Sequence, residues 1–126
     1  MADHTILIVD DTPDHRDLLR VLLQAVGYRV VTAPSSEAAA RAQHEQPDLI
    51  LAELSLPGQA AWEAARALRA MPTLADTPML GTTVYNTLIH TARAEAIGCA
   101  GYVEKPFNID YLLHRIGQLL PTTLSA

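Results

Sequence analysis

The sequence has a single cysteine, Cys99, among its 126 residues. One thiol cannot close a disulfide within the chain, and it cannot assemble a cysteine-based metal motif. A disulfide framework and a cysteine-ligated metal site are therefore excluded, and a reducing cytoplasm fits this composition. Cys99 lies between Gly98 and Ala100, where we expect a small buried residue.

Positive charge and long apolar runs are also scarce. Nine basic residues stand against 14 acidic ones, the formal net charge is −5, and no basic run occurs, so we expect no direct binding of nucleic acid. Asp3 stands where a signal peptide would carry positive charge, and no apolar stretch approaches the ~18 residues of a membrane-spanning helix. We expect a cytoplasmic protein without membrane association, folded as one domain over 1–126 with a flexible tail at about 121–126.

The apolar residues that are present fall into short runs that alternate with helical patterns. Continuous rather than alternating apolar runs indicate strands covered on both faces. The predicted strands are 6–9, 28–32, 48–53, 78–84 and 100–104, and the predicted helices are 13–26, 36–45, 60–70, 88–97 and 108–120. This alternation predicts an α/β fold with a five-stranded parallel sheet in the order 2-1-3-4-5 and helices on both faces.

The helix boundaries carry their own signals. Thr12 is expected to cap the first helix, with Pro13 in its first turn and Gly27 after its last residue. Asn108 is expected to cap the last helix. Between 60 and 70, Arg66 and Arg69 should point outward, because the apolar side chains of that segment recur at helical spacing on the opposite face.

Polar residues stand where the predicted strands end. Asp10 and Asp11 follow the first strand, Glu53 ends the third, Thr83 lies near the end of the fourth, and Lys105 follows the fifth. Ligands of such sheets bind outside the carboxyl ends of the strands, at the switch point between strands 1 and 3. Taken singly, the aspartates are explained as caps of the first helix and Thr83 as a packed residue at a strand end. Their convergence from four strands favours a site.

Lys105 is the only lysine among the nine basic residues. Lysine is a compact point charge suited to one anionic oxygen, whereas arginine is a wide fork. The five histidines are spread along the chain without ligand spacing, so we expect surface or packing roles for them rather than a metal site.

These blocks together resemble the receiver domain of bacterial response regulators. The matching segments are 6–11 (ILIVDD), 47–58 (PDLILAELSLPG), Thr83, and 98–107 with its Tyr102 and terminal Lys105-Pro106-Phe107. The resemblance extends from Thr5 to Leu120, and its blocks occur in the right order. It implies a flavodoxin-like doubly wound (βα)5 sandwich and a role in two-component, phosphorelay signal transduction.

The resemblance also implies roles for single residues. Asp10, Asp11, Glu53 and the backbone carbonyl of Ser55 would bind Mg²⁺. Thr83 and Lys105 would contact phosphoryl oxygens, and Tyr102 would be the aromatic residue that swings inward on activation.

Glu53 departs from the family, whose phosphoacceptor at this position is aspartate. The added methylene moves the carboxylate by about 1 Å, and a misplacement of ~1 Å can cost ~10²-fold in rate. We therefore expect an atypical stand-alone receiver that acts through protein–protein interaction, independently of aspartyl phosphorylation. The alternative is a slowly phosphorylated receiver that uses Mg²⁺ and a phosphohistidine or a small phosphodonor.

Two versions of the leading hypothesis remain open. Glu53 could reach Thr83 and Lys105 and mimic the active state, with Tyr102 turned inward, or it could pair with Lys105 and lock a silent scaffold. The clustered carboxylates would attract Mg²⁺, because two unit charges 4 Å apart interact by about 4 kcal/mol at an effective dielectric of 20. The longer Glu53 intrudes on the metal's place, so Mg²⁺ binding is expected to be weakened or absent.

The expected partner is a protein, either a sensor kinase, a downstream effector or a second copy of the chain. By analogy the surface would combine the fourth helix, fifth strand and fifth helix, with Leu88, Ile89, Tyr102 and exposed parts of 108–120. A small-ligand binder on a similar sheet is disfavoured, because the acidic loop after the first strand would repel phosphate. A hydrolase of the haloacid-dehalogenase type is disfavoured as well, because it needs aspartates two positions apart and position 12 is threonine. We expect no enzyme activity of its own.

Overall fold

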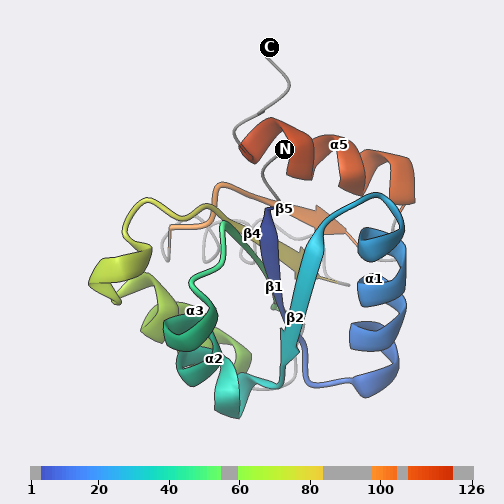
Figure 1. The fold of residues 1–126 in the computed structure, drawn as a ribbon. Helices are drawn as coiled ribbons and strands as arrows, with labels where there is room; N and C mark the ends of the chain where they lie inside the picture. Colours follow the sequence, from blue (N-terminus) through green and yellow to red (C-terminus); the bar gives the residue numbers. More distant parts are fainter. Residues whose placement is uncertain (1–3, 55–59, 84–97, 105–107, 121–126) are drawn as a thin grey trace.

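Five parallel strands form one sheet at the centre of the computed structural model, which describes residues 4–54, 60–83, 98–104 and 108–120 (Figure 1). The strands are β1 (Thr5–Val9), β2 (Arg29–Ala33), β3 (Leu49–Glu53), β4 (Met79–Thr83) and β5 (Gly101–Glu104). Their order is β2-β1-β3-β4-β5, which confirms the predicted sheet.

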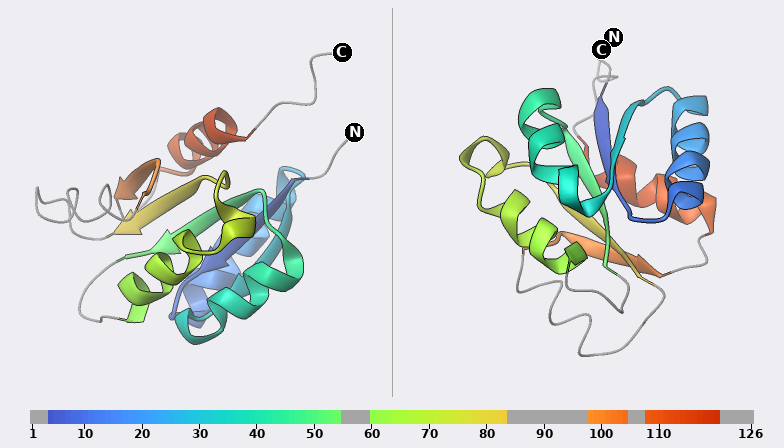
Figure 2. Two further views of the ribbon diagram at one scale, coloured as in Figure 1. Left: turned by 90° about the vertical axis from the view of Figure 1, so that its left-hand side faces the viewer. Right: turned by 90° about the horizontal axis from the view of Figure 1, so that it is seen from below.

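Helices cover both faces of this sheet. They are α1 (Pro13–Ala25), α2 (Ala38–Glu45), α3 (Ala60–Arg69) and α5 (Ile109–Leu119), with short 3₁₀ helices η1 (Ser35–Glu37) and η2 (Pro72–Leu74). Helices α2 and α3 lie on one face and α1 and α5 on the other (Figures 1 and 2). The helix predicted at 88–97 and the predicted tail lie outside the described residues.

Side chains of the central strands alternate between two hydrophobic clusters. In β1, Leu7 and Val9 pack in the cluster under α2 and α3, whereas Ile6 and Ile8 pack in the cluster under α1 and α5. All four are buried. Because successive strand residues point to opposite faces, a strand covered on both sides must be apolar throughout, as the sequence indicated.

Loop geometry explains the ends of α1. Thr12 precedes the helix and Pro13 begins it, as predicted, but no described atom bonds to the Thr12 side chain as a cap. Its backbone N–H instead donates to Asp10 Oδ1 at 2.9 Å. Gly27 follows the helix with φ +104°, a left-handed conformation that glycine adopts at little cost, and its N–H donates to Gln24 O at 3.0 Å.

The second helix is shorter than predicted. A 3₁₀ turn occupies Ser35–Glu37, and the α-helix begins only at Ala38, because Glu37 adopts φ −114° and ψ 2°. The helix ends at Glu45, and the next residue, Gln46, takes a left-handed φ of 49°. Pro47 disfavours the right-handed helical conformation for the residue before it, which accounts for this ending.

Helix α3 buries Trp62, Ala65 and Leu68, which confirms the predicted inner face. The last helix is capped as predicted, since Asn108 Oδ1 accepts from the backbone N–H of Tyr111 at 3.2 Å. Within the described residues, no helix has both the length and the apolar character that crossing a bilayer requires.

The outward orientation predicted for Arg69 is wrong. Its guanidinium turns back along the end of α3 and donates to the backbone carbonyls of Leu74, Thr77 (2.9 Å) and Gly98 (3.4 Å). Two of these carbonyls lie in the turns after α3, where Leu74 O also accepts from the Thr77 N–H at 3.0 Å. A long cationic donor at the last helical position can reach such backbone carbonyls.

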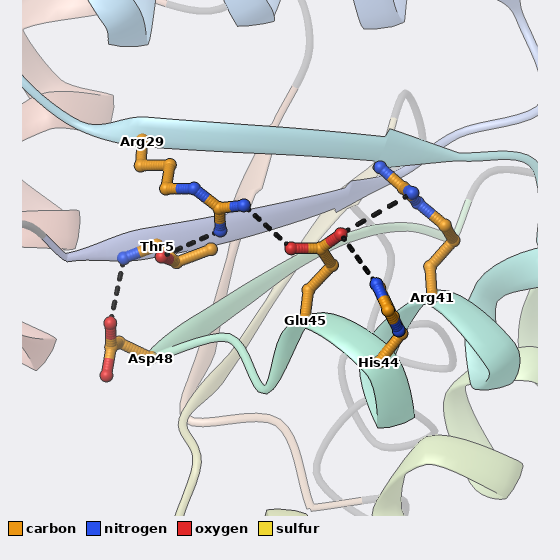
Figure 3. A network of polar contacts seen from close by, with 6 residues as sticks. All are labelled: Thr5, Arg29, Arg41, His44, Glu45 and Asp48. Carbon is orange, nitrogen blue, oxygen red and sulfur yellow. Dashed lines mark hydrogen bonds and ion pairs between the residues drawn. The ribbon is translucent and has the colours of Figure 1, made fainter.

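A polar network joins three elements at the amino-terminal ends of the strands (Figure 3). Arg29 of β2 donates to Glu45 Oε1 at 2.8 Å and to Thr5 Oγ1 at 3.4 Å. Asp48 Oδ2 accepts from the backbone N–H of Thr5 at 2.8 Å. Chiefly through the Arg29 hydrogen bond, and also through charge attraction by Arg29, Arg41 and His44, the pKa of Glu45 lies below its ordinary value.

The charge on Glu45 should make the stability of the fold depend on pH. Because its pKa is lowered in the folded state, the unfolded chain binds this proton more readily, and the stabilisation is lost as the pH falls through the folded pKa. Glu45→Gln should therefore lower the urea midpoint at about pH 7 and have a smaller effect at about pH 3. Glu63→Gln, at an exposed carboxylate of α3, is the matched control. Equal losses for both variants at both pH values would contradict the assignment.

Candidate functional site

The register between β1 and β3 brings two acidic residues to the same edge of the sheet. Val9 pairs with Ala52, so the residues that follow them, Asp10 and Glu53, lie side by side at the carboxyl ends of β1 and β3. Glu53 is paired on its other side with Thr82 of β4. The Asp10 side chain is buried and Glu53 is half-buried, which places the pair at the mouth of the predicted switch point.

Two contacts from the following segment hold Asp10. Its Oδ1 accepts the Thr12 N–H described above, and its backbone carbonyl accepts from Arg16 Nη1 at 2.6 Å. An aspartate that bonds the backbone two residues onward forms a local turn that fixes its carboxylate. The second oxygen, Oδ2, consequently faces the first turn of α1.

Asp11 takes a different direction. Its side chain is exposed, and its two carboxylate oxygens accept from the backbone N–H and the hydroxyl of Ser35, each at 2.7 Å. These bonds connect the end of β1 to the start of η1. Asp10 and Asp11 are thus adjacent in sequence, yet the structure brings only Asp10 together with Glu53.

His15 is the residue that sequence reasoning missed. It lies in the first turn of α1, and its Nδ1 is 3.6 Å from Asp10 Oδ2. Within the described residues, Asp10, His15 and Glu53 are the one group of three possible metal ligands, with one atom of each lying within 4.8 Å of the others. Ligand spacing along the chain gave no sign of this approach of His15 to the two carboxylates. The position of His15 in the sequence could have indicated this, because the helix that follows the first strand begins over the crevice at the switch point.

The other predicted site residues are described only in part. Thr83 ends β4 opposite Glu104 of β5, and Tyr102 of β5 pairs with Gly81 of β4. For Thr83 and Tyr102 the structure describes only the backbone. Ser55 and Lys105 lie outside the described residues.

The described donors suit a cation. Two carboxylates and one imidazole converge, and carboxylate charges up to 4.8 Å apart repel by about 3 kcal/mol or more at an effective dielectric of 20. A divalent ion between them would replace this repulsion by attraction. Carboxylate oxygens are ligands that Mg²⁺ accepts, usually one or two per ion with water completing the shell, so Asp10 and Glu53 fit that ion.

Comparison with known proteins identifies the family and the fold. The model of the response regulator receiver domain matches residues 6–117. The solved structure of the chemotaxis protein CheY4 of Vibrio cholerae is similar over 94% of this chain and 100% of its own, with 32% identity and a TM-score of 0.88. The receiver domain of the sensor histidine kinase PA1611 of Pseudomonas aeruginosa PAO1 was solved with a magnesium ion coordinated in its active-site cleft. It shares 25% identity at a TM-score of 0.82, over 94% of this chain and 98% of that one.

Longer proteins are similar as well. The phosphate regulon transcriptional regulatory protein PhoB of Pseudomonas aeruginosa is 32% identical over 124 residues, which are 98% of this chain and 54% of PhoB. The chain thus spans about half the length of this curated relative. With the family model covering most of its length and strand ends arranged as described, this chain belongs to the response regulator receiver domains of two-component signalling.

Proposed function

We propose that this chain is an atypical receiver that works through protein–protein contacts and independently of aspartyl phosphorylation. The observation that supports the proposal is Glu53, which ends β3 beside Asp10, where the family has its acceptor aspartate. A cytoplasmic location is part of the proposal, supported by a chain whose one thiol needs no oxidising compartment.

The chemistry of phosphoryl transfer explains why one methylene matters. The acceptor carboxylate must attack phosphorus in line, while cations neutralise charge on the phosphoryl oxygens. The resemblance assigns Glu53 to the position of the family's aspartate, and from that position its longer side chain would place the nucleophilic oxygen elsewhere. A displacement of about 1 Å is enough to cost ~10²-fold in rate.

Magnesium is the cofactor that this family implies. In this chain Asp10 and Glu53 would hold it, with Asp11 and the Ser55 carbonyl as further candidates by resemblance. The two hydrogen bonds that Asp11 accepts from Ser35 compete with such a role. The ion would supply positive charge that relieves the crowding of carboxylates. Because Asp11 is engaged and Glu53 is longer than aspartate, we propose that Mg²⁺ binds more weakly than in the family.

Glu53 could set the conformational state of the receiver in two ways. If it reaches Thr83 and Lys105, its carboxylate stands near the place of a phosphoryl group, with fewer charges and oxygens than that group carries. Such a contact would hold an active-like state, with Tyr102 turned inward. If Glu53 only pairs with Lys105, the receiver is a silent scaffold.

The proposed partner is a protein that binds the face made by α5, β5 and the helix predicted at 88–97. Leu88 and Ile89 lie outside the described residues. On α5 the structure describes an exposed Tyr111, half of whose surface is accessible. A sensor kinase, a downstream effector or a second copy of the chain would bind there, and nucleic acid would not be contacted directly.

Intact mass analysis after incubation with acetyl phosphate and Mg²⁺ tests the proposal. Wild type should gain no phosphoryl group, whereas Glu53→Asp should gain one, because it restores the reach of the acceptor while keeping its charge. Glu63→Asp is the matched control for the substitution itself.

Modification of wild type at a rate comparable to Glu53→Asp would make this chain an ordinary phosphorylatable receiver and contradict the proposal. If neither protein is modified, Glu53 is not what prevents the reaction, and the central argument fails.

Thermal unfolding with and without Mg²⁺ tests the cation site. At about pH 8 in EDTA, Asp10→Asn should stabilise the fold by about 1 kcal/mol, a fraction of the charge repulsion because Glu53 is half-exposed. It should also reduce the stabilisation that Mg²⁺ gives wild type. Asp14→Asn, at an exposed residue of α1, should leave the Mg²⁺ response unchanged. An unchanged Mg²⁺ response in Asp10→Asn would remove Asp10 from the site.

A crystal structure separates the active mimic from the scaffold. The mimic requires Tyr102 turned inward and Glu53 in contact with both Thr83 and Lys105. Tyr102 facing solvent, with Thr83 drawn away from Glu53, would sink the mimic and leave the scaffold.

A further inference from the structure

One edge of the sheet is formed by β2. It is the first strand in the sheet order, so it pairs with β1 on one side only. In Figure 1 it is the strand nearest the viewer, between α1 and α2, and no described helix or strand crosses in front of it. The pairing with β1 runs without interruption from Arg29 to Ala33, so no bulge turns this edge away from solvent.

The backbone of β2 directs alternate residues toward the free edge. Its first residue, Arg29, donates its N–H to His4 O at 3.0 Å, and the carbonyl of its last residue, Ala33, accepts a 3.1 Å bond from the residue after β1. In a parallel ladder, residues that bond one neighbouring strand alternate with residues that point away from it. Val30 and Thr32 therefore direct their N–H and C=O groups outward, where the described residues place no further strand.

The two edges of the sheet are protected to different degrees. The segment of β2, RVVTA, contains neither proline nor lysine, and Val30, Val31 and Thr32 are β-branched. The opposite edge strand, β5, has only four residues and begins with Gly101, where the Arg115 guanidinium leaves no room for a Cβ atom. Of the two edges, β2 is the one suited to pair with a further strand.

A second copy of β2 fits this edge in an antiparallel arrangement. When Val30 of each copy lies opposite Thr32 of the other, every outward N–H meets an outward carbonyl. Val31 then faces its own counterpart on a two-fold axis, which gives the isologous contact typical of homodimers. Moving the axis by one residue would leave a carbonyl opposite Pro34, which has no N–H, or opposite Tyr28, whose N–H is already bonded within its own copy.

The charges at the two ends of β2 also complement each other. Half-exposed Arg29 begins the strand, and its guanidinium has N–H groups left after its bonds to Thr5 and Glu45. The exposed acids Asp11 and Glu37 lie around the end of the strand. An antiparallel pair places the basic start of each strand beside the acidic end of the other, which favours this orientation. The edge therefore fits a second copy better than an unrelated extended segment.

We propose that this chain forms a homodimer through the β2 edges of two copies, with one continuous sheet running through both. The contact lies at the opposite edge of the sheet from β5, so it leaves the α5 face open for the protein partner proposed above. The inference depends neither on Glu53 nor on phosphorylation, so the mass experiment can fail while the dimer holds, and the reverse.

Sedimentation equilibrium of the full chain over a wide range of protein concentration tests the proposal. Wild type should show a reversible equilibrium between monomer and dimer. Thr32→Pro should raise the dissociation constant about tenfold or more, because it removes half of the interchain N–H donors and spares every bond to β1. Thr32→Val is the matched control, since it keeps the backbone donor and the β-branch, and it should dimerise as wild type does.

Glu37→Arg tests the charge arrangement without placing proline in a strand. The reversal puts like charges beside Arg29 of the second copy, so the dissociation constant should rise severalfold, with a larger effect at low salt. Glu63→Arg makes the same change in charge at an exposed residue of α3 and should leave the constant unchanged. If circular dichroism shows that Thr32→Pro does not fold, this pair of variants decides the question.

Three results would each overturn the proposal. They are a wild type that stays monomeric at the highest concentration, a folded Thr32→Pro that dimerises as wild type does, and an equal loss of dimer in Glu37→Arg and Glu63→Arg. Tyr111→Ala, on the exposed side of α5, should leave the dimer unchanged. Loss of the dimer in this variant would place the contact on the α5 face and contradict pairing through β2.

Discussion

The cleft depends on the parallel register between β1 and β3. Both strands are buried on their two faces, and their side chains alternate between separate hydrophobic clusters. A slip of one residue would exchange every side chain between the two faces, so the pairing of Val9 with Ala52 is strongly specified. The acidic residues that follow are brought together by this core, which does not itself require their chemistry.

The sequence was sufficient to predict the sheet, because the patterns that indicate each strand lie within a short segment of the chain. Continuous apolar runs mark strands covered on both sides, and the rules for parallel connections then leave few arrangements. The strand order and the buried face of α3 follow from such patterns. The start of α2 was harder, because an α-helix and a 3₁₀ turn share nearly the same residue preferences in a segment as short as 35–38.

Side-chain directions in the cleft could be predicted only in part. The convergence of strand ends placed Asp10 and Glu53 correctly at one edge, but adjacent aspartates look equivalent in a sequence. Their difference arises from tertiary partners, since Ser35 engages Asp11 from a distant segment while Thr12 orients Asp10. The position of His15 likewise depends on where α1 begins relative to β3, which spacing along the chain does not encode.

Arg69 donates a hydrogen bond to the Gly98 carbonyl although the two residues are 29 positions apart. Gly98 has φ +86°, and a Cβ atom built on it would lie 2.7 Å from Arg69 Cδ. Any larger residue at 98 would therefore strain the backbone and displace the side chain that donates to three carbonyl groups. Over evolutionary time these two positions should covary, so that a homologue with a side chain at 98 would carry a shorter residue at 69 and a different donor for the turn after α3.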